Sequence, residues 1–212
     1  MSVEPDEDAA LMLRVQQGDL DAFESLVTKY RQPIFHFIYR TLLDPDETED
    51  LAQAVFVQAW KAAPRYQVRS RFSTWLFTIA RNLCLNELRR RGRHPTESLD
   101  APVEGTDSPR EHDHLDTRTK GVEDSVLTHE LEAKVGEAVA DLPEAQRTAL
   151  LLFKDQELPY EEIGRVMGVS VSATKSLIHR ARETLKRRLK NYLGTGDWTS
   201  AHGRETLPDS RG

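Results

Sequence analysis

Apolar residues in the C-terminal third of the chain recur at helical spacing on both sides of a glycine. From Tyr160 to Met167 they share one helix face, and charged residues occupy the other. Gly168 then permits the left-handed backbone that ends many helices, and Ser170 offers a hydroxyl to cap a second helix. The second helix is predicted over residues 171–189, with a buried side made of Leu177, Ile178, Ala181, Leu185 and Leu189. This pattern predicts a helix-turn-helix.

The opposite side of this second helix carries hydrogen-bond donors near its start, where a recognition helix meets base edges and phosphates. These donors are Ser172, Lys175, Ser176, His179 and Arg180. The alternative is a solvated basic helix in an ordinary helical domain. We favour DNA binding, because the glycine turn, the periodicity and the donor cluster coincide.

The N-terminal half also has helical periodicity. A first helix is expected to start at Asp19 or Asp21, and Asp44-Pro45-Asp46 is expected to break the chain. Apolar spacing predicts further helices over residues 33–43, 49–60 and 72–91. The single cysteine, Cys84, excludes an internal disulfide and falls where a small buried thiol is expected.

Charge is distributed unevenly along the chain, whose net charge is −6. Between Arg65 and Arg93 there are eight arginines against one acid, Glu87. Residues 95–124 are acidic and rich in proline and glycine, and they have almost no apolar side chains, as in a flexible linker. The negative charge is therefore concentrated away from the basic helices.

These features predict an all-α protein with two small helical domains, joined by a flexible acidic linker over residues 94–126. The domains are expected over residues 19–93 and 127–193. Residues 1–18 are expected to form an acidic tail and the start of the first helix, and residues 194–212 a disordered tail.

Other functions receive little support from the sequence. No apolar run could cross a membrane, and the acidic N-terminus lacks the features of a signal peptide, so a cytoplasmic location is expected. Glu111, His112, Asp113 and His114 are metal-ligand types, but a solvated linker is the better interpretation. Catalytic and phosphate-binding motifs are missing, so we expect no enzyme activity, cofactor or metal.

Four blocks, in this order, resemble the extracytoplasmic-function group of bacterial sigma factors. They are DAFESLVTKYRQPIFHFIYR, EDLAQAVFVQAW, RFSTWLFTIARNLCLNELRRR and LPEAQRTALLLFKDQELPYEEIGRVMGVSVSATKSLIHRARETL. The resemblance implies sigma region 2 in the N-terminal domain and sigma region 4, with the helix-turn-helix, in the C-terminal domain. It implies a protein that binds the largest subunits of core RNA polymerase and directs it to promoter DNA, under the control of an anti-sigma factor.

The resemblance also implies roles for individual residues. Polymerase binding is assigned to Asp50, Gln53, Phe56 and Trp60. The alternative is that Phe56 and Trp60 are core residues, and we favour it for Phe56, so Asp50 and Gln53 are the better contact candidates. The residues assigned to recognition and melting of the minus-ten element are Arg69, Arg71, Arg81, Asn82, Asn86, Arg89 and Arg90. Recognition of the minus-thirty-five element falls to Ser172, Lys175, Ser176, His179 and Arg180. The alternative for the arginines is a solvated face.

Two departures from the family pattern affect these sites. The loop before the fourth helix lacks the family's glycine, and Val68 restricts its backbone. Thr174 replaces an apolar residue, and its hydroxyl is expected to bond back to a helix carbonyl. A stand-alone helix-turn-helix regulator and a protein-binding adaptor remain as alternative functions. The regulator would not need the segment EDLAQAVFVQAW or the helix rich in arginine and asparagine. In the adaptor, the N-terminal bundle would bind a protein and the basic segments would only increase solubility.

Overall fold

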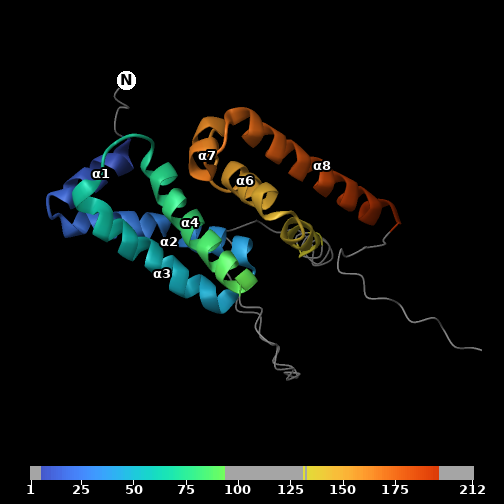
Figure 1. The fold of residues 1–212 in the computed structure, drawn as a ribbon, viewed down its shortest axis with the longest axis horizontal. Coiled ribbons are helices and arrows are strands. Elements are labelled where there is room, and N and C mark those ends of the chain that lie inside the picture. The colour runs from blue at the N-terminus through green and yellow to red at the C-terminus, as the bar shows by residue number, and fades with distance from the viewer. Residues whose placement is uncertain (1–5, 94–130, 132, 196–212) are drawn as a thin grey trace, which may run out of the picture.

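The computed structural model describes residues 6–93, 131 and 133–195, and their regular secondary structure is helical (Figure 1). Residues 94–130, which hold the whole of the expected linker with Glu111, His112, Asp113 and His114, lie outside the described residues, as do residues 196–212 of the expected tail. None of the helices in the described part of the chain is long and apolar enough to cross a membrane.

Helix α1, Glu7–Gln16, begins at Asp6, whose carboxylate accepts a hydrogen bond from the Ala9 amide at 2.7 Å. The sequence predicts only a tail and the start of a helix here, so it does not predict α1 as a separate helix. Its signal is the Asp6 cap followed by apolar positions at helical spacing, and the side chains of Ala9, Met12 and Val15 are buried.

Helix α2, Leu20–Leu42, begins at Asp19, one of the two predicted starts, which accepts from the Ala22 amide at 3.0 Å. The sequence predicts a second helix starting at Pro33, but the structure has one continuous helix with Pro33 inside it. A proline inside a helix costs about 3 kcal/mol, whereas each large apolar side chain that is buried contributes about 1.5–3 kcal/mol. The buried stripe that continues through the proline offsets that cost; its members are Leu26, Tyr30, Ile34, Phe37 and Ile38.

Helix α3, Pro45–Ala62, starts earlier than residue 49, where the sequence predicts it. The prediction treats Asp44-Pro45-Asp46 as a break, but a proline at the first helical position loses no hydrogen bond, and Asp44 is the N-cap. A 3-10 helix, η1 (Ala63–Arg65), and a loop lead to α4, Phe72–Arg93, which starts where predicted.

The second domain contains a helix over residues 133–140, then α6 (Glu144–Lys154), α7 (Tyr160–Met167) and α8 (Val171–Thr195). Helix α7 has the predicted bounds, and α8 starts where predicted but extends beyond residue 189.

The two domains pack against each other, which the sequence does not predict. Helix α4 contacts α2 and α3 of its own domain and also α7 of the second domain, and α2 contacts α6 (Figure 1). The Arg147 guanidinium of α6 donates to the Thr41 carbonyl of α2 at 2.8 Å. Arg40 and Asp155 form an ion pair across the same contact at 2.7 Å. Cys84 is buried in α4, as expected.

Two glycines in helices provide a matched test of how closely α7 packs against the turn that precedes α8. A methyl group on Gly164 would lie 2.9 Å from the Val169 carbonyl oxygen, whereas one on Gly136 would meet no atom within 4 Å. We expect Gly164→Ala to lower the free energy of unfolding by roughly 1–3 kcal/mol, because backbone must move. Gly136→Ala should raise it by about 0.5–1 kcal/mol, since alanine is the better helix former. Urea unfolding followed by circular dichroism measures both, and equal effects of the same sign would contradict the packing.

Candidate nucleic-acid interface

The turn between α7 and α8 has the geometry that the sequence predicts. Gly168 ends α7 with φ 67°, in the left-handed region. The Ser170 hydroxyl accepts a hydrogen bond from the Ala173 amide at 3.2 Å and so caps α8. The Thr174 hydroxyl donates to the Ser170 carbonyl at 3.1 Å, which confirms its expected bond within the helix. This turn fixes the direction of α8 relative to α7.

The side chains predicted for the minus-thirty-five element are all exposed on the first half of α8: Ser172, Lys175, Ser176, His179 and Arg180. The Ser176 hydroxyl donates to the Ser172 carbonyl at 3.0 Å. The Lys175 ammonium lies 5.6 Å from the centre of the Tyr160 ring, within the range of a cation–π contact. Donors and positive charge therefore face solvent together.

A hollow of about 690 Å³ follows this face of α8. Tyr160 from the start of α7 forms one wall, and the other lining residues come from α8: Lys175, Ile178, His179, Arg182, Glu183 and Lys186. The sequence places Arg182 and Lys186 among the residues that extend the charge of this helix but assigns them no site, although they recur at helical spacing after Lys175 and His179. Their spacing is the signal that identifies them.

On α4, Asn82 and Asn86 are both exposed and lie one helical turn apart, so they share a face. Arg89 is exposed near the end of the helix. Arg81 differs, because its Nε atom is buried and has no hydrogen-bond partner among the described residues. The two asparagines and Arg89 are thus available to a strand that lies along α4, whereas Arg81 is only partly available.

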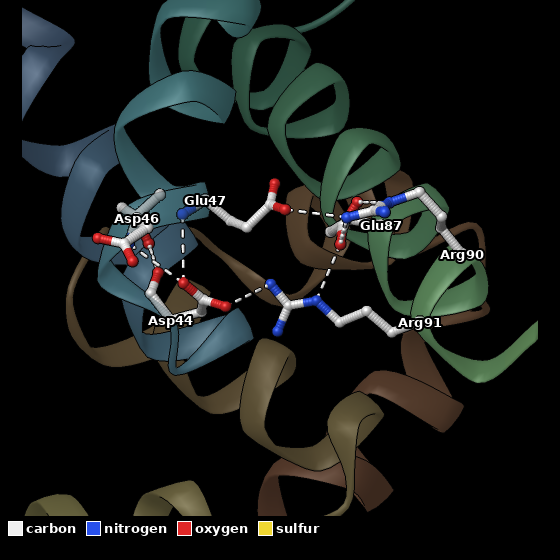
Figure 2. A network of polar contacts seen from close by, with 7 residues as sticks. Asp44, Asp46, Glu47, Glu87, Arg90 and Arg91 are labelled. Carbon is white, nitrogen blue, oxygen red and sulfur yellow. Dashed lines mark hydrogen bonds and ion pairs between the residues drawn. The ribbon is translucent and has the colours of Figure 1, made fainter. Parts of the chain in front are cut away.

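Arg90, another predicted minus-ten residue, belongs to a network of ion pairs that joins the end of α4 to the start of α3 (Figure 2). Its guanidinium contacts Glu47 at 2.9 Å and Glu87 at 2.7 Å. Arg91 bridges Glu87 and Asp44 in the same way. Hydrogen bonds from Arg90 and Arg91 lower the pKa of Glu87. Arg90 therefore holds two helices together as well as presenting charge, a role that its sequence position does not reveal.

The loop over residues 66–71 leads into α4. Arg69 and Arg71, both predicted to contact the minus-ten strand, are exposed. The Arg69 guanidinium donates to Gln67 Oε1 at 2.6 Å. Tyr66 is buried and packs edge-on against Trp75, with ring centres 5.0 Å apart. The face of the loop that meets solvent is therefore polar and basic.

The predicted polymerase-binding residues lie along α3. Asp50 and Gln53 are exposed, Phe56 is partly buried against the core, and Trp60 is 41% exposed with its ring centre 4.9 Å from that of Phe23. An open groove of about 660 Å³ lies between α3 and α2. Its lining includes Gln53 and Phe56, and the sequence did not single out its other members: Val27, Arg31, Gln32, Phe35, Glu49, Ala52 and Val57.

The part of the chain that the structure describes has no candidate metal site. No three histidine, cysteine or acidic side chains lie close enough there to bind one metal ion. The surfaces described above present hydrogen-bond donors and cations on α8 and α4, and a partly apolar groove between α2 and α3.

Two family models match the chain in the order of its domains. Sigma-70 region 2 matches residues 26–94, and Sigma-70, region 4 matches residues 132–185. The first covers α3, the loop and α4, and the second covers the helix-turn-helix.

Relatives and solved structures agree with these matches. The chain is 39% identical to the RNA polymerase sigma-H factor of Pseudomonas aeruginosa, over 89% of this chain and 96% of that protein. It is 34% identical to the ECF RNA polymerase sigma factor SigW of Bacillus subtilis, over 84% and 94%. The sigma factor RpoE of Bartonella quintana, solved in complex with the anti-sigma factor NepR, has a TM-score of 0.62 and 25% identity, covering 81% of this chain and 98% of that one. This chain therefore belongs to the sigma-70 family, as a member of its extracytoplasmic-function group.

Proposed function

We propose that this chain, as a sigma factor that directs transcription initiation, reads the minus-thirty-five element with α8 and captures the minus-ten strand with α4 and its loop. The supporting observation is that both exposed sets of donors occur in one chain, each on the region that the family models match. Core RNA polymerase and promoter DNA are its partners, and its location is the cytoplasm, where bacterial polymerase acts.

The charge and position of the α8 side chains support the minus-thirty-five role. Lys175 and Arg180 can donate to guanine acceptors or to phosphates, and Ser172, Ser176 and His179 lie on the same exposed part of the helix. The hollow beside them adds Arg182 and Lys186. A cationic hollow of this kind suits a phosphate backbone that runs past the recognition helix.

The minus-ten role rests on the side chains that α4 and the loop leave in solvent. A carboxamide can read a base edge with two hydrogen bonds, and Asn82 and Asn86 present two of them on one face. Arg69, Arg71 and Arg89 supply positive charge for the strand's phosphates, and Arg81 and Arg90 contribute less because they are partly buried or paired.

The groove between α2 and α3 supports polymerase binding. Gln53, Phe56 and Val57 of α3 line it, and Asp50 is exposed on the same helix. A groove that combines apolar area with polar side chains fits a helical partner, which docks one face of a helix into it. We assign this partner to a helix of the largest polymerase subunit.

The chain cannot contact the two promoter elements at the same time while its domains are packed together. Elements named for positions ten and thirty-five lie about 25 base pairs apart, or roughly 85 Å at 3.4 Å per base pair. Helix α7, which contacts α4, leads directly into α8. The domains must therefore separate, and we propose that residues 94–126 act as the flexible acidic linker that allows it.

An anti-sigma factor would act on this separation. A hollow of about 460 Å³ lies where Arg40 of α2 meets α6 and α8, and apolar side chains such as Val139, Leu151 and Leu185 line it. Lys154 and Arg182 also line it, so it suits an apolar helix with acidic flanks. The complex of RpoE with NepR supports a partner of this class.

A run-off transcription assay tests the polymerase contact. Purified bacterial core polymerase is combined with the wild-type chain or with an Asp50→Ala, Gln53→Ala variant, on a library of genomic fragments. We expect discrete transcripts from the wild type and a loss of about tenfold in the variant, because the changes remove polar contacts worth about 0.5–1.5 kcal/mol each. Binding of promoter fragments by the wild-type chain alone, without transcripts, would instead indicate a stand-alone regulator.

A salt series tests the recognition helix. We expect Lys175→Ala to weaken promoter binding by the holoenzyme roughly five- to tenfold and to reduce the slope of log affinity against log salt by about 1, as for the loss of one phosphate contact. Lys190→Ala is the matched control, since Lys190 is exposed farther along the same helix. Fluorescence anisotropy measures both, and equal losses in the two variants would show that only bulk charge matters.

A further inference from the structure

The loop that precedes α4 is anchored by a helix outside the residues that the region 2 model matches, 26–94. Gln16, the last residue of α1, donates from its side-chain amide to the Pro64 carbonyl at 3.1 Å and to the Tyr66 carbonyl at 3.4 Å. Pro64 lies within η1, and Tyr66 directly follows η1 at the start of the loop. One side chain thus bridges two backbone carbonyls at the point where the loop begins.

The Tyr66 side chain also holds the start of the loop against the core. It is 4% exposed, and its ring packs edge-on against Trp75 and Phe72 at the start of α4. Burial, together with the charges of Asp6 and Asp8 of the α1 segment, raises the pKa of Tyr66 to about 12. Tyr66 therefore stays neutral and buried, and it is not available as a stacking platform for a base.

Helix α1, which carries Gln16, is joined to α2 by polar contacts near both of its ends. The Asp8 carboxylate accepts a hydrogen bond from the Tyr30 hydroxyl at 2.6 Å and forms an ion pair with Lys29 at 2.6 Å. At the other end of α1, Arg14 pairs with Asp19 at 2.7 Å. The helix is thus attached to α2 at both ends, and Gln16 transmits that attachment to the loop.

We propose that Gln16 is a positioning residue for strand capture: it holds the loop in the shape in which Gln67, Arg69 and Arg71 meet the separated minus-ten strand. This inference rests on the proposed minus-ten role of the loop. A base that leaves the stack must find its contacts already in place, because a loop that has to be ordered at that moment weakens the capture. Gln16 touches no DNA in this scheme and acts through the loop backbone.

Gln16 can be changed without dismantling the fold. Its bond to Pro64 lies in an exposed position, so water can replace the amide when the side chain is removed. The buried residues of α1, Met12 and Val15, remain in place in such a variant. The adjacent Gln17 is also exposed, but it follows the end of the helix and supplies the matched control.

The test compares holoenzymes that contain the full-length wild type, Gln16→Ala, Gln16→Glu or Gln17→Ala. Three dissociation constants are measured for each variant. One is that of the free chain for core polymerase, and the other two are those of the holoenzyme for duplex minus-thirty-five DNA and for a non-template single strand that carries the minus-ten element of a promoter mapped by run-off transcription. We expect Gln16→Ala to weaken single-strand capture about three- to tenfold, as for the loss of one or two hydrogen bonds, and to leave the other two constants within about twofold.

The Gln16→Glu variant should weaken capture at least as much, because an ionised carboxylate has no hydrogen to donate and faces two carbonyl oxygens. Gln17→Ala should match the wild type. Normal capture by Gln16→Ala, or equal loss in all three constants, would overturn the positioning role while leaving the proposed function intact. Failure of the wild-type holoenzyme to capture the strand would remove the minus-ten assignment, and this inference with it.

Discussion

The burial of α4 on two sides is the constraint on which the rest of the molecule depends. Phe72, Leu76 and Ala80 of this helix are buried, and α4 contacts α1, α2 and α3 as well as α7. The apolar core is consequently continuous from one domain to the other. Only the remaining strip of α4 reaches solvent, and it carries Asn82, Asn86 and Arg89. The packing thereby determines which side chains of α4 a partner can contact.

Local signals in the sequence were sufficient where a cap, a turn residue and an apolar stripe agree. The bounds of α7, the left-handed Gly168 and the Ser170 cap could all be predicted, because each depends on neighbouring residues. Local rules were wrong at Pro33, where burial along α2 outweighs the proline, and at Pro45, which begins α3 instead of preceding it. Tertiary packing overrides propensity in the first case, and the special first position of a helix explains the second.

The site could be predicted only as a set of residue types. Sequence spacing identifies exposed donors on α8 and α4, but pairing between distant residues decides what each side chain is free to do. Arg90 contacts Glu47, far away in the sequence, and Gln16 reaches the carbonyls of Pro64 and Tyr66. Such contacts have no local signature, since they exist only once α1, α3 and α4 are assembled. The same holds for the contact between the two domains.

That contact between domains has a composition suited to opening. The Arg147 guanidinium is buried, and burial lowers the pKa of Arg147, which means that its charged form is less stable there than in water. Its hydrogen bonds to the Ala140 and Thr41 carbonyls offset part of this cost, and Arg40 and Asp155 add a partly exposed ion pair of small net value. On separation, water would solvate these groups, so the polar part of the interface opposes opening only weakly. The apolar surface around α4 and α7 must then supply most of the closing free energy, and a partner that covers that surface can shift the balance.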